Sequence, residues 1–374
     1  MMEYREMALD DIVNIRTGKL NSNAAVGNGE YVFFTCAPEP LRIDKYKYDQ
    51  AAILLAGNNA DGNFHINYFE GKFEVYQRTY IIDSKDTEKY DLRYIFYALK
   101  ECLSEFKSMS QGTSTKFLTM AILKAFNLKI PDIDLQRKIS QILLMIDEKI
   151  KCNNQINRNL SEQAKSVYME IFENFEKTKV LEDYPVKIYS GGTPSTSKKE
   201  YWEGGDIHWL SSGETANEFV ITTDKTITQL GVDNSSTKWA SKYDVVTASA
   251  GQGHTRGQTT MILLDTCINQ SVIVTHAAKE YMPFIFFNLS GRYEELRVLS
   301  DGTSTRGSLT TKIMAKLKMP DAAKNEIIRF SDYAWPVISQ IEVNLKENEK
   351  LACLRDSLLP KLISGELDVS DLDI

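Results

Sequence analysis

Two loops of the sequence place amide, hydroxyl and cationic side chains between glycines. The first loop spans residues 57–63 and carries the amides Asn58, Asn59 and Asn63. The second spans residues 251–258 and carries five polar side chains: Gln252, His254, Thr255, Arg256 and Gln258. Asn and Gln can pair with the edge of adenine, and Arg can pair with the edge of guanine. These loops could therefore read nucleic-acid bases, although glycine-rich strings also form purely structural turns.

A second pair of segments repeats Gly-Thr-Ser-Thr followed by a cation. The two copies supply these candidate contacts: Thr113, Ser114, Thr115, Lys116, Thr303, Ser304, Thr305 and Arg306. Hydroxyl and cationic groups suit contacts to phosphate, and the alternative is again a structural turn. A third candidate group stands in the second half of the chain: Lys198, Lys199 and Tyr201.

The motifs of the common catalytic families are missing from the sequence. It contains no G-x-x-x-x-G-K-[ST] phosphate loop, no G-x-S-x-G elbow and no Asn/Asp-Pro-Pro-aromatic string of an amino-methyltransferase. A metal nuclease could be sought in Asp132 with Asp147-Glu148-Lys149, because such enzymes cluster carboxylates. Residues 147–149 lie in a helical pattern, however, where charges are expected to face solvent. Neither the cysteines nor the histidines have zinc-ligand spacing. We expect no catalytic residue and no metal.

The segments that must position these residues are repeated along the chain. Gly112-Thr113-Ser114-Thr115 matches residues 302–305 at an offset of 190, and Pro131-Asp132 matches Pro320-Asp321 at an offset of 189. Gln77 can be set against Gln270 at an offset of 193. Four consecutive identities followed by Pro-Asp make chance improbable, so the chain contains a repeat of about half its length.

A helical stretch follows each Pro-Asp, with apolar residues at spacings of three and four, typical of a coiled-coil seam. At an offset of 191 the two seams superpose and share polar positions. An antiparallel pair related by a two-fold axis would bring Asn153 near Asn348 and Asn157 near Asn344. The alternative is two separate helices whose asparagines face solvent. Pro336 predicts that the second helix starts or kinks there. The expected pairing residues are Ile146, Ile150, Asn153, Asn157, Leu160, Val337, Ile341, Asn344, Asn348 and Leu351.

The rest of each half consists of short β-branched segments bounded by Gly and Asn, which indicates strands, with a helical segment near the end. The predicted fold class is α+β, with two mixed α/β domains joined by two long antiparallel coiled-coil helices in a pseudo-two-fold repeat. The expected boundaries are residues 1–132 for domain 1, 133–178 for helix 1, 179–320 for domain 2, and 321–374 for helix 2 and the tail.

The composition is that of an ordinary globular protein. Of 374 residues, 43% are hydrophobic, and the net charge of −7 argues against a strongly basic polyanion binder. Nucleic-acid binding through local sites remains possible. No apolar run is long enough to span a membrane, and the N-terminal stretch has acids where a signal peptide would be basic and apolar. The odd number of cysteines fits a reducing compartment, so we expect a cytoplasmic location.

The second half opens with a string that resembles a known family. It contains Gly191-Gly192-Thr193-Pro194-Ser195, then Tyr201-Trp202, then Ile207-x-Trp209. These features occur in this order in target-recognition domains of type I restriction-modification specificity subunits. Residues 17–36 look like that family's other common opening, and residues 357–369 resemble the end of its second helix. The first half lacks the Gly-Gly-Thr-Pro-Ser turn, so its loop cannot be read by simple transfer.

The resemblance implies a DNA-reading subunit with no catalysis and no cofactor of its own. It would bind double-stranded DNA and hold two methyltransferase subunits, on which S-adenosylmethionine chemistry modifies adenine, and restriction subunits could join. Each domain would read one half of a bipartite site, and because the two halves of the chain differ, the site would be asymmetric. Two alternatives stand beside this function: the recognition subunit of a type IIB-like system, and a coiled-coil scaffold that does not bind DNA.

Overall fold

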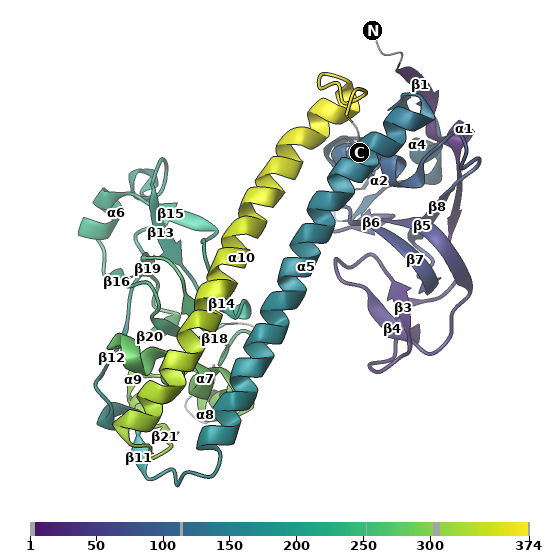
Figure 1. Cartoon of the computed structure of the whole chain (residues 1–374). Helices are drawn as coiled ribbons and strands as arrows, with labels where there is room; N and C mark the ends of the chain where they lie inside the picture. The colour runs from purple at the N-terminus through teal and green to yellow at the C-terminus, as the bar shows by residue number, and fades with distance from the viewer. Residues whose placement is uncertain (1–3, 113–114, 252, 302–306, 373–374) are drawn as a thin grey trace. The chain divides into compact units, whose positions relative to one another are not determined.

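The computed structural model describes residues 4–112, 115–251, 253–301 and 307–372. The chain divides into two compact units. Unit 1 comprises Met1–Ile150 and Lys350–Ile374, and unit 2 comprises Lys151–Glu349. The two longest helices, α5 (Ile133–Phe172) and α10 (Lys324–Ser364), each contribute one end to unit 1 and the other end to unit 2 (Figure 1).

A six-stranded sheet organises the described part of unit 1. All of its neighbouring strands are antiparallel except the parallel pair β3 and β7. The strand order is β2 (Val13–Thr17), β8 (Thr79–Ser84), β5 (Tyr48–Ala56), β7 (Ile66–Val75), β3 (Tyr31–Phe34) and β4 (Leu41–Ile43). Two short ladders accompany it: β1 (Arg5–Ala8) pairs with β10 (Asn127–Ile130), and β6 (Asn58–Asn59) pairs with β9 (Lys116–Phe117).

The apolar run of β5 is buried on both faces of this sheet. Side chains alternate between the two faces of a strand, so Ile53 and Leu55 enter one hydrophobic cluster while Ala52 and Leu54 enter another. The first cluster also receives four short helices: α1 (Leu9–Ile12), α2 (Leu92–Glu101), α3 (Leu103–Met109) and α4 (Met120–Ala125). The side chain of Asp91 caps α2 by accepting a hydrogen bond from the Tyr94 amide at 2.7 Å.

Both long helices complete the core of unit 1. From α5, Leu135, Ile139 and Leu143 pack into the cluster, and from α10 and the residues after it come Leu359, Leu362, Ile363 and Val369. The chain after α10 turns back at Gly365, which has a φ of +80°. There the Tyr4 hydroxyl donates a hydrogen bond to the Leu362 carbonyl. Residues far apart in sequence therefore meet in one core.

Unit 2 contains two larger sheets among its described residues. One has the order β12 (Val186–Ser190), β20 (Val272–Ala277), β17 (Val245–Ala248), β18 (Thr259–Ile262) and β14 (Phe219–Val220). The other has the order β15 (Lys225–Ile227), β13 (Ile207–Leu210), β19 (Thr266–Ile268) and β16 (Lys238–Ala240). A short ladder pairs β11 (Lys179–Val180) with β21 (Lys318–Met319). The shorter helices of the unit are α6 (Gln229–Asp233), α7 (Met282–Ser290), α8 (Tyr293–Asp301) and α9 (Thr311–Ala315).

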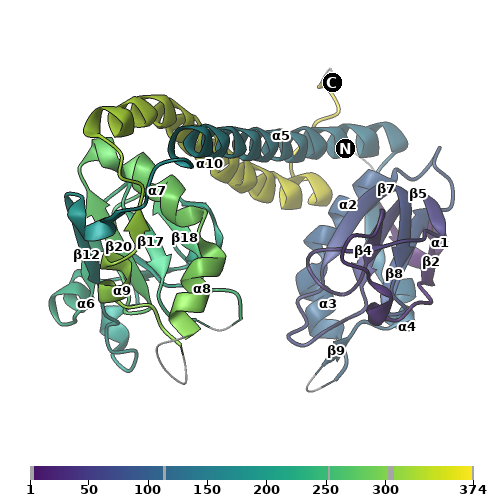
Figure 2. The ribbon, with the colours of Figure 1, turned by 90° about the horizontal axis from the view of Figure 1, so that it is seen from below.

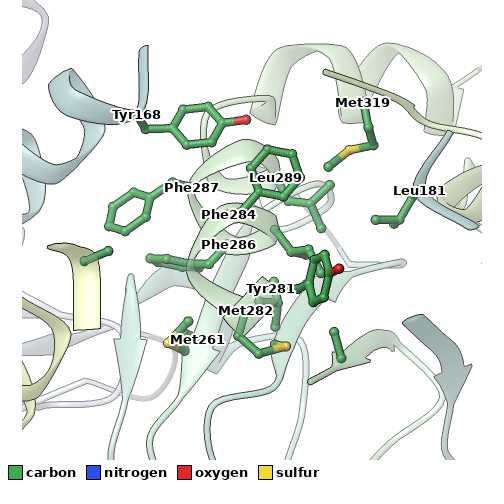
Figure 3. Close-up of a cluster of buried hydrophobic side chains, with 14 of the residues drawn as sticks. Tyr168, Leu181, Met261, Tyr281, Met282, Phe284, Phe286, Phe287, Leu289 and Met319 are labelled. Carbon is green, nitrogen blue, oxygen red and sulfur yellow. The ribbon is translucent and has the colours of Figure 1, made fainter. Parts of the chain in front are cut away.

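The helix α7 lies in the core of unit 2. Phe284, Phe286 and Phe287, which lie within about one turn of this helix, are all buried (Figure 3). Tyr168 and Phe172 of α5 pack against Phe284, and Phe330 of α10 packs against Phe287, with centroids 5.0–6.0 Å apart. Burial of large aromatic side chains is a major contribution to core stability, so this cluster fixes α5 and α10 within the unit.

The elements repeat between the two units as the sequence predicts. The ladder β1–β10 corresponds to β11–β21, and the antiparallel pair β2–β8 corresponds to β12–β20. The helix α10 corresponds to α5. The predicted fold class, two mixed α/β parts with two long antiparallel helices in a two-fold repeat, is confirmed.

The helix seam within unit 2 contains paired asparagines. Asn153 donates a hydrogen bond to the Asn348 side-chain oxygen at 2.9 Å, and Asn344 donates one to Asn157 at 2.7 Å. Rising numbers on α5 meet falling numbers on α10, so the helices are antiparallel there. Three of these asparagines are nearly inaccessible, while Asn348 is half-buried.

Two details of the helices differ from the sequence expectation. α10 begins at Lys324 and passes through Pro336, so the expectation of a helix start there is wrong, while the alternative of a kink stays a prediction. Proline has no amide hydrogen, so the Asp332 carbonyl loses its helical hydrogen bond. Pro336 and Asp332 are both exposed, so water can donate a hydrogen bond to this carbonyl instead. In addition, Ile338, which was not among the expected pairing residues, is fully buried. Val337 and Leu160 are half-buried against the same core, and Ile150 and Leu351 are also half-buried.

Asp147 differs from the expected solvent-facing charge of a helix. Its carboxylate accepts hydrogen bonds from the Tyr97 hydroxyl and from Arg355, each at 2.7 Å. Burial, followed by the hydrogen bond to Asp147, raises the pKa of Tyr97 above its ordinary value. Asp147 is therefore a structural link between α2, α5 and α10 in unit 1. Among the described residues, no helix is both long enough and apolar enough to cross a membrane.

Candidate nucleic-acid interface

Three segments of unit 1 converge on one surface, which we call loop cluster 1: residues 57–63, 77–78, and 107–117 without residues 113–114. The ladder of β6 and β9 sets Asn58 opposite Phe117 and Asn59 opposite Lys116. Lys107 donates a hydrogen bond to Asn63 at 2.8 Å. The two loops that the sequence singles out in this half are thus joined. β9 lies at the end of unit 1 away from α5 (Figure 2).

The backbone of loop cluster 1 is internally supported. The Asn59 side-chain oxygen accepts hydrogen bonds from the Asp61 and Asn63 amides, which closes the first loop. Gln111 and Phe117 exchange backbone hydrogen bonds at 2.8 and 3.0 Å and close the second loop. Thr115 and Lys116 lie in this second loop, whereas Thr113 and Ser114 lie outside the described residues.

The corresponding segments of unit 2 also converge, and we call them loop cluster 2: residues 249–258 without 252, 270–271, 293–301 and 307–309. Arg256 forms an ion pair with Asp301 at 2.6 Å, and its side chain is only 14% exposed. The Tyr293 hydroxyl donates to the His254 carbonyl, and Arg297 donates to the Gly253 carbonyl. Thr255 and Gln258 lie in the same turn, where the Gln258 amide donates to the Thr255 carbonyl.

Five predicted contacts in unit 2 cannot be placed, because they lie outside the described residues: Gln252, Thr303, Ser304, Thr305 and Arg306.

The same backbone junction supports both clusters. In unit 1, Gly57 donates to the Arg78 carbonyl at 2.8 Å and accepts from the Leu118 amide at 2.9 Å. In unit 2, Ser249 donates to the Ser271 carbonyl at 2.8 Å and accepts from the Leu309 amide at 2.9 Å. The same backbone arrangement therefore supports the loops in both units, while the side chains of these loops differ.

A second junction links the opening loop of each unit to its cluster. Gln77 donates to the Asn21 side chain at 2.8 Å in unit 1, while in unit 2 the Thr193 hydroxyl donates to the side chain of the matched residue Gln270. A side chain at Gly191 would collide with the Ile268 carbonyl, at 2.1 Å, and one at Gly18 with the Val75 carbonyl, at 2.0 Å. Gly191 is thus a structural residue of its turn. Gly18 has the same structural role, although the Gly-Gly-Thr-Pro-Ser motif that contains Gly191 is missing around it.

The third predicted group lies on a separate short helical turn, Lys199–Tyr201. Tyr201 is 5% exposed and accepts a hydrogen bond from Lys198, while Lys199 forms an ion pair with Glu203. Because its ring is buried, Tyr201 is a packing residue, and we withdraw it as a contact. Nearby, Trp202 packs edge-on against the buried Trp209 at 5.0 Å.

A carboxylate–imidazole pair elsewhere in unit 2 could suggest catalysis. Asp244 lies 2.6 Å from His276 Nδ1, and burial raises the pKa of Asp244 above its ordinary value despite this contact. Asp244 also accepts from the Ser241 amide and the Tyr189 hydroxyl. Among the described residues, no hydroxyl or thiol forms a hydrogen bond with the His276 ring, so the pair has no nucleophile to activate. Nor does any described group of His, Cys, Asp and Glu suit a metal ion.

The two α/β units repeat the same elements, and each presents a supported cluster of polar loops, so the chain is a protein with an internal repeat. Comparison with known proteins identifies its kind. The chain belongs to the family described as the type I restriction modification DNA specificity domain, whose model matches residues 1–162 and 186–327.

Individual relatives agree with this family. The specificity subunit of the type I restriction enzyme HindI from Haemophilus influenzae is 21% identical over 355 residues, covering 73% of this chain and 76% of that protein. The EcoDI specificity subunit from Escherichia coli is 29% identical over 142 residues, which cover 38% of this chain and 31% of that protein. A crystal structure of a type I S subunit from M. genitalium has a TM-score of 0.64 at 16% identity, over 99% of this chain and 97% of that one, which is a likeness of fold.

Proposed function

We propose that this chain is the sequence-reading subunit of a type I restriction-modification complex, and that it reads a bipartite, asymmetric site in double-stranded DNA. Loop cluster 1 reads one half-site and loop cluster 2 reads the other. The observation that carries this proposal is the repeated loop junction, Gly57 with Arg78 and Ser249 with Ser271, on which the two units hold different polar side chains.

The side chains at the two clusters account for the asymmetry. Cluster 1 offers the amides Asn58, Asn59 and Asn63, which suit adenine, with Lys116 for phosphate. Cluster 2 offers His254, Thr255 and Gln258 around the Arg256–Asp301 ion pair. Two surfaces with different donors and acceptors favour different base pairs, so the two half-sites differ and the site is not a palindrome.

The long helices set the distance between the half-sites and dock the methyltransferase subunits. At 1.5 Å per residue, about 40 residues of helix span roughly 60 Å, against about 34–36 Å for one turn of DNA. Each helix also exposes large apolar side chains: Met145, Ile156 and Met169 on α5, and Tyr333, Val343 and Leu354 on α10. A docked methyltransferase subunit would cover these side chains.

The chemistry belongs to the partners. S-adenosylmethionine binds to the methyltransferase subunits, which modify adenine within the site, and the restriction subunits cleave DNA. The chain itself supplies no catalytic residue. Its net charge of −7 weakens long-range attraction to DNA, so the partner subunits contribute much of the grip on phosphate.

The test is a map of methylated bases in the source genome with and without this gene. We expect the deletion to abolish adenine methylation at one split, asymmetric motif, and a plasmid copy of the gene to restore it. An unchanged map in a strain that expresses the partner methyltransferase would contradict the proposal and favour a scaffold. Cleavage on both sides of the motif by a single partner chain would favour a type IIB-like system.

A further inference from the structure

Arg78 occupies a rigid turn between β7 and β8. Its carbonyl accepts hydrogen bonds from the Gly57 amide at 2.8 Å and from the Cys36 thiol at 3.3 Å. Gly57 approaches so closely that a Cβ there would lie 2.5 Å from the Arg78 oxygen. The base of the Arg78 side chain is therefore fixed within loop cluster 1.

The guanidinium of Arg78 is exposed and lies beside an exposed aromatic ring. It stands 5.8 Å from the centroid of Phe117, whose side chain is 38% exposed. In the described part of unit 1, Arg78 has no carboxylate partner, whereas Arg16 pairs with Asp83 and Arg93 with Glu70. A planar guanidinium beside a ring keeps its fork of donors ordered.

Loop cluster 1 surrounds Arg78 with amides and the cations Lys107 and Lys116, together with one exposed acid, Asp61. Lys116 and Asn59 lie opposite each other in the ladder of β6 and β9, beside Phe117, and Lys107 is bonded to Asn63. In a chain with a net charge of −7, an exposed arginine that forms no ion pair among the described residues of unit 1 is available to an external acceptor. The two lysines suffice for nearby phosphates, which leaves the ordered fork of Arg78 for a base.

We propose that Arg78 determines specificity by reading a guanine in the half-site of unit 1, with its two donors on the N7 and O6 acceptors of that base. This inference rests on the proposed function. The acceptor pair of guanine in the major groove matches the arginine fork, and such a contact is a common source of base discrimination. Phe117 acts as a positioning residue that holds the guanidinium plane. At the equivalent turn of unit 2 stands Ser271, so the two half-sites differ at this position.

The experiment uses the full complex with its methyltransferase subunits and a panel of DNA duplexes. In the panel, each base pair of both half-sites is replaced in turn. The variants are Arg78→Ala, Arg78→Lys and Phe117→Leu, with Arg42→Ala as the matched control. Arg42 lies on β4 of the same unit and bonds the Glu30 carbonyl, away from loop cluster 1.

We expect wild type to prefer G·C at one position of one half-site by about 5- to 150-fold. Arg78→Ala should reduce that preference to about 1, and Arg78→Lys should do the same while losing less affinity, because lysine keeps the charge but not the fork. Phe117→Leu should weaken the preference partly. Unchanged preferences at the other half-site show that each variant complex is intact, and Arg42→Ala should match wild type.

Other outcomes overturn the inference. If Arg78→Ala lowers affinity for every duplex alike and reduces the salt slope by about 0.9, Arg78 contacts a phosphate. If Arg78→Ala changes nothing, its exposed guanidinium makes no contact with DNA. If the wild-type complex has no base preference at either half-site, the proposed function itself fails, and this result is distinct from the other two.

Discussion

Asn157 and Asn344 show why polar residues occupy an otherwise apolar helix seam. Both are nearly buried, and Asn344 donates to Asn157 at 2.7 Å while accepting from Gln340 at 2.8 Å. A buried amide pair costs stability compared with packed leucines, but it penalises every helix register that separates the two groups. The pair therefore specifies how α5 and α10 align within unit 2.

We predict that Asn157→Leu alone lowers the free energy of unfolding by about 1–3 kcal/mol, because it leaves the Asn344 amide buried without its partner. The double variant with Asn344→Leu should cost less than the sum of the single variants, by about 1 kcal/mol. Thermal unfolding would show this as a difference of about 2–4 °C. Solvent-exposed Asn159→Leu is the control, and strictly additive losses would show that the pair is not coupled.

Arg256 is the arginine that sequence reasoning favours as a base contact, but its guanidinium is largely covered and paired with Asp301. We predict that Arg256→Ala weakens recognition of the half-site read by unit 2 about tenfold, through loss of the ion pair that holds the loops together. Asp301→Ala should have the same effect, which base-substituted duplexes would measure. A loss confined to the half-site of unit 1 would reject the assignment of these loops.

At the scale of elements, a buried carboxylate joins α10 to the turn between β16 and β17 in unit 2. Glu342 accepts hydrogen bonds from Lys242 at 2.7 Å, Lys346 at 2.6 Å and Tyr243 at 3.1 Å, and its side chain is 9% exposed. Burial alone would raise the pKa of Glu342, but these three donors outweigh it and leave the pKa below its ordinary value. The charged form is therefore the one that stabilises the fold.

Because the folded-state pKa of Glu342 is depressed, its contribution is present above the ordinary carboxyl pKa and is lost as pH falls through the folded value. We predict that Glu342→Gln costs about 1–3 kcal/mol at neutral pH. It should also flatten the decline in melting temperature below about pH 4.3. Melting curves across pH, with exposed Glu349→Gln as control, measure both effects. A parallel decline in wild type and Glu342→Gln would contradict this account.

The helices could be predicted where a sequence pattern repeats. They could not be predicted where exposure to solvent or packing geometry offsets a local sequence signal. Spacings of three and four predicted both long helices, and the offset of 191 predicted which asparagines meet. Pro336 suggested a helix start or a kink, because a sequence does not state that the affected carbonyl is exposed. Ile338 was not expected in the core, since a helix with 3.6 residues per turn drifts from a strict heptad.

The loops of the candidate interface could be predicted from the sequence, but the turn that carries Arg78 could not. Glycine and amide composition identified residues 57–63, and the repeated Gly-Thr-Ser-Thr identified the segment that meets them. Arg78 escaped notice because a single arginine in a short turn has no pattern of its own. Its signal was nevertheless present, since Gln77 and Gln270 match and Arg78 follows directly. Tyr201 was misjudged because a sequence does not reveal that a tyrosine in a polar string is buried.

At the scale of the whole molecule, unit 1 is discontinuous in sequence. The side chains of Leu359, Leu362, Ile363 and Val369 complete a core that otherwise consists of residues before 150. Sequence reasoning assigned residues 321–374 to one helix and its tail, and periodicity alone does not reveal that the two ends of a helix belong to different cores.

We predict that a chain ending after Glu349 keeps unit 2 folded and loses unit 1. Each fully buried aliphatic side chain contributes roughly 1.5–3 kcal/mol, so the loss of four approaches the whole stability of an ordinary domain. Hydrogen exchange should then show unprotected amides in β5 and β8 but protected amides in β17 and β20. A chain ending after Ser370 is the control. Retained protection in β5 would show that the core of unit 1 is self-sufficient.

The split of unit 1 also has a consequence for the order of biosynthesis. Residues 1–150 leave the ribosome first, yet the side chains that close their core are translated only after residues 151–349. The contiguous unit can fold as it emerges, while the earlier one waits with apolar surface uncovered. A message cut short before the codons of residues 350–369 would therefore damage the unit that is translated earlier, and chaperones that shield nascent chains would be needed longest there.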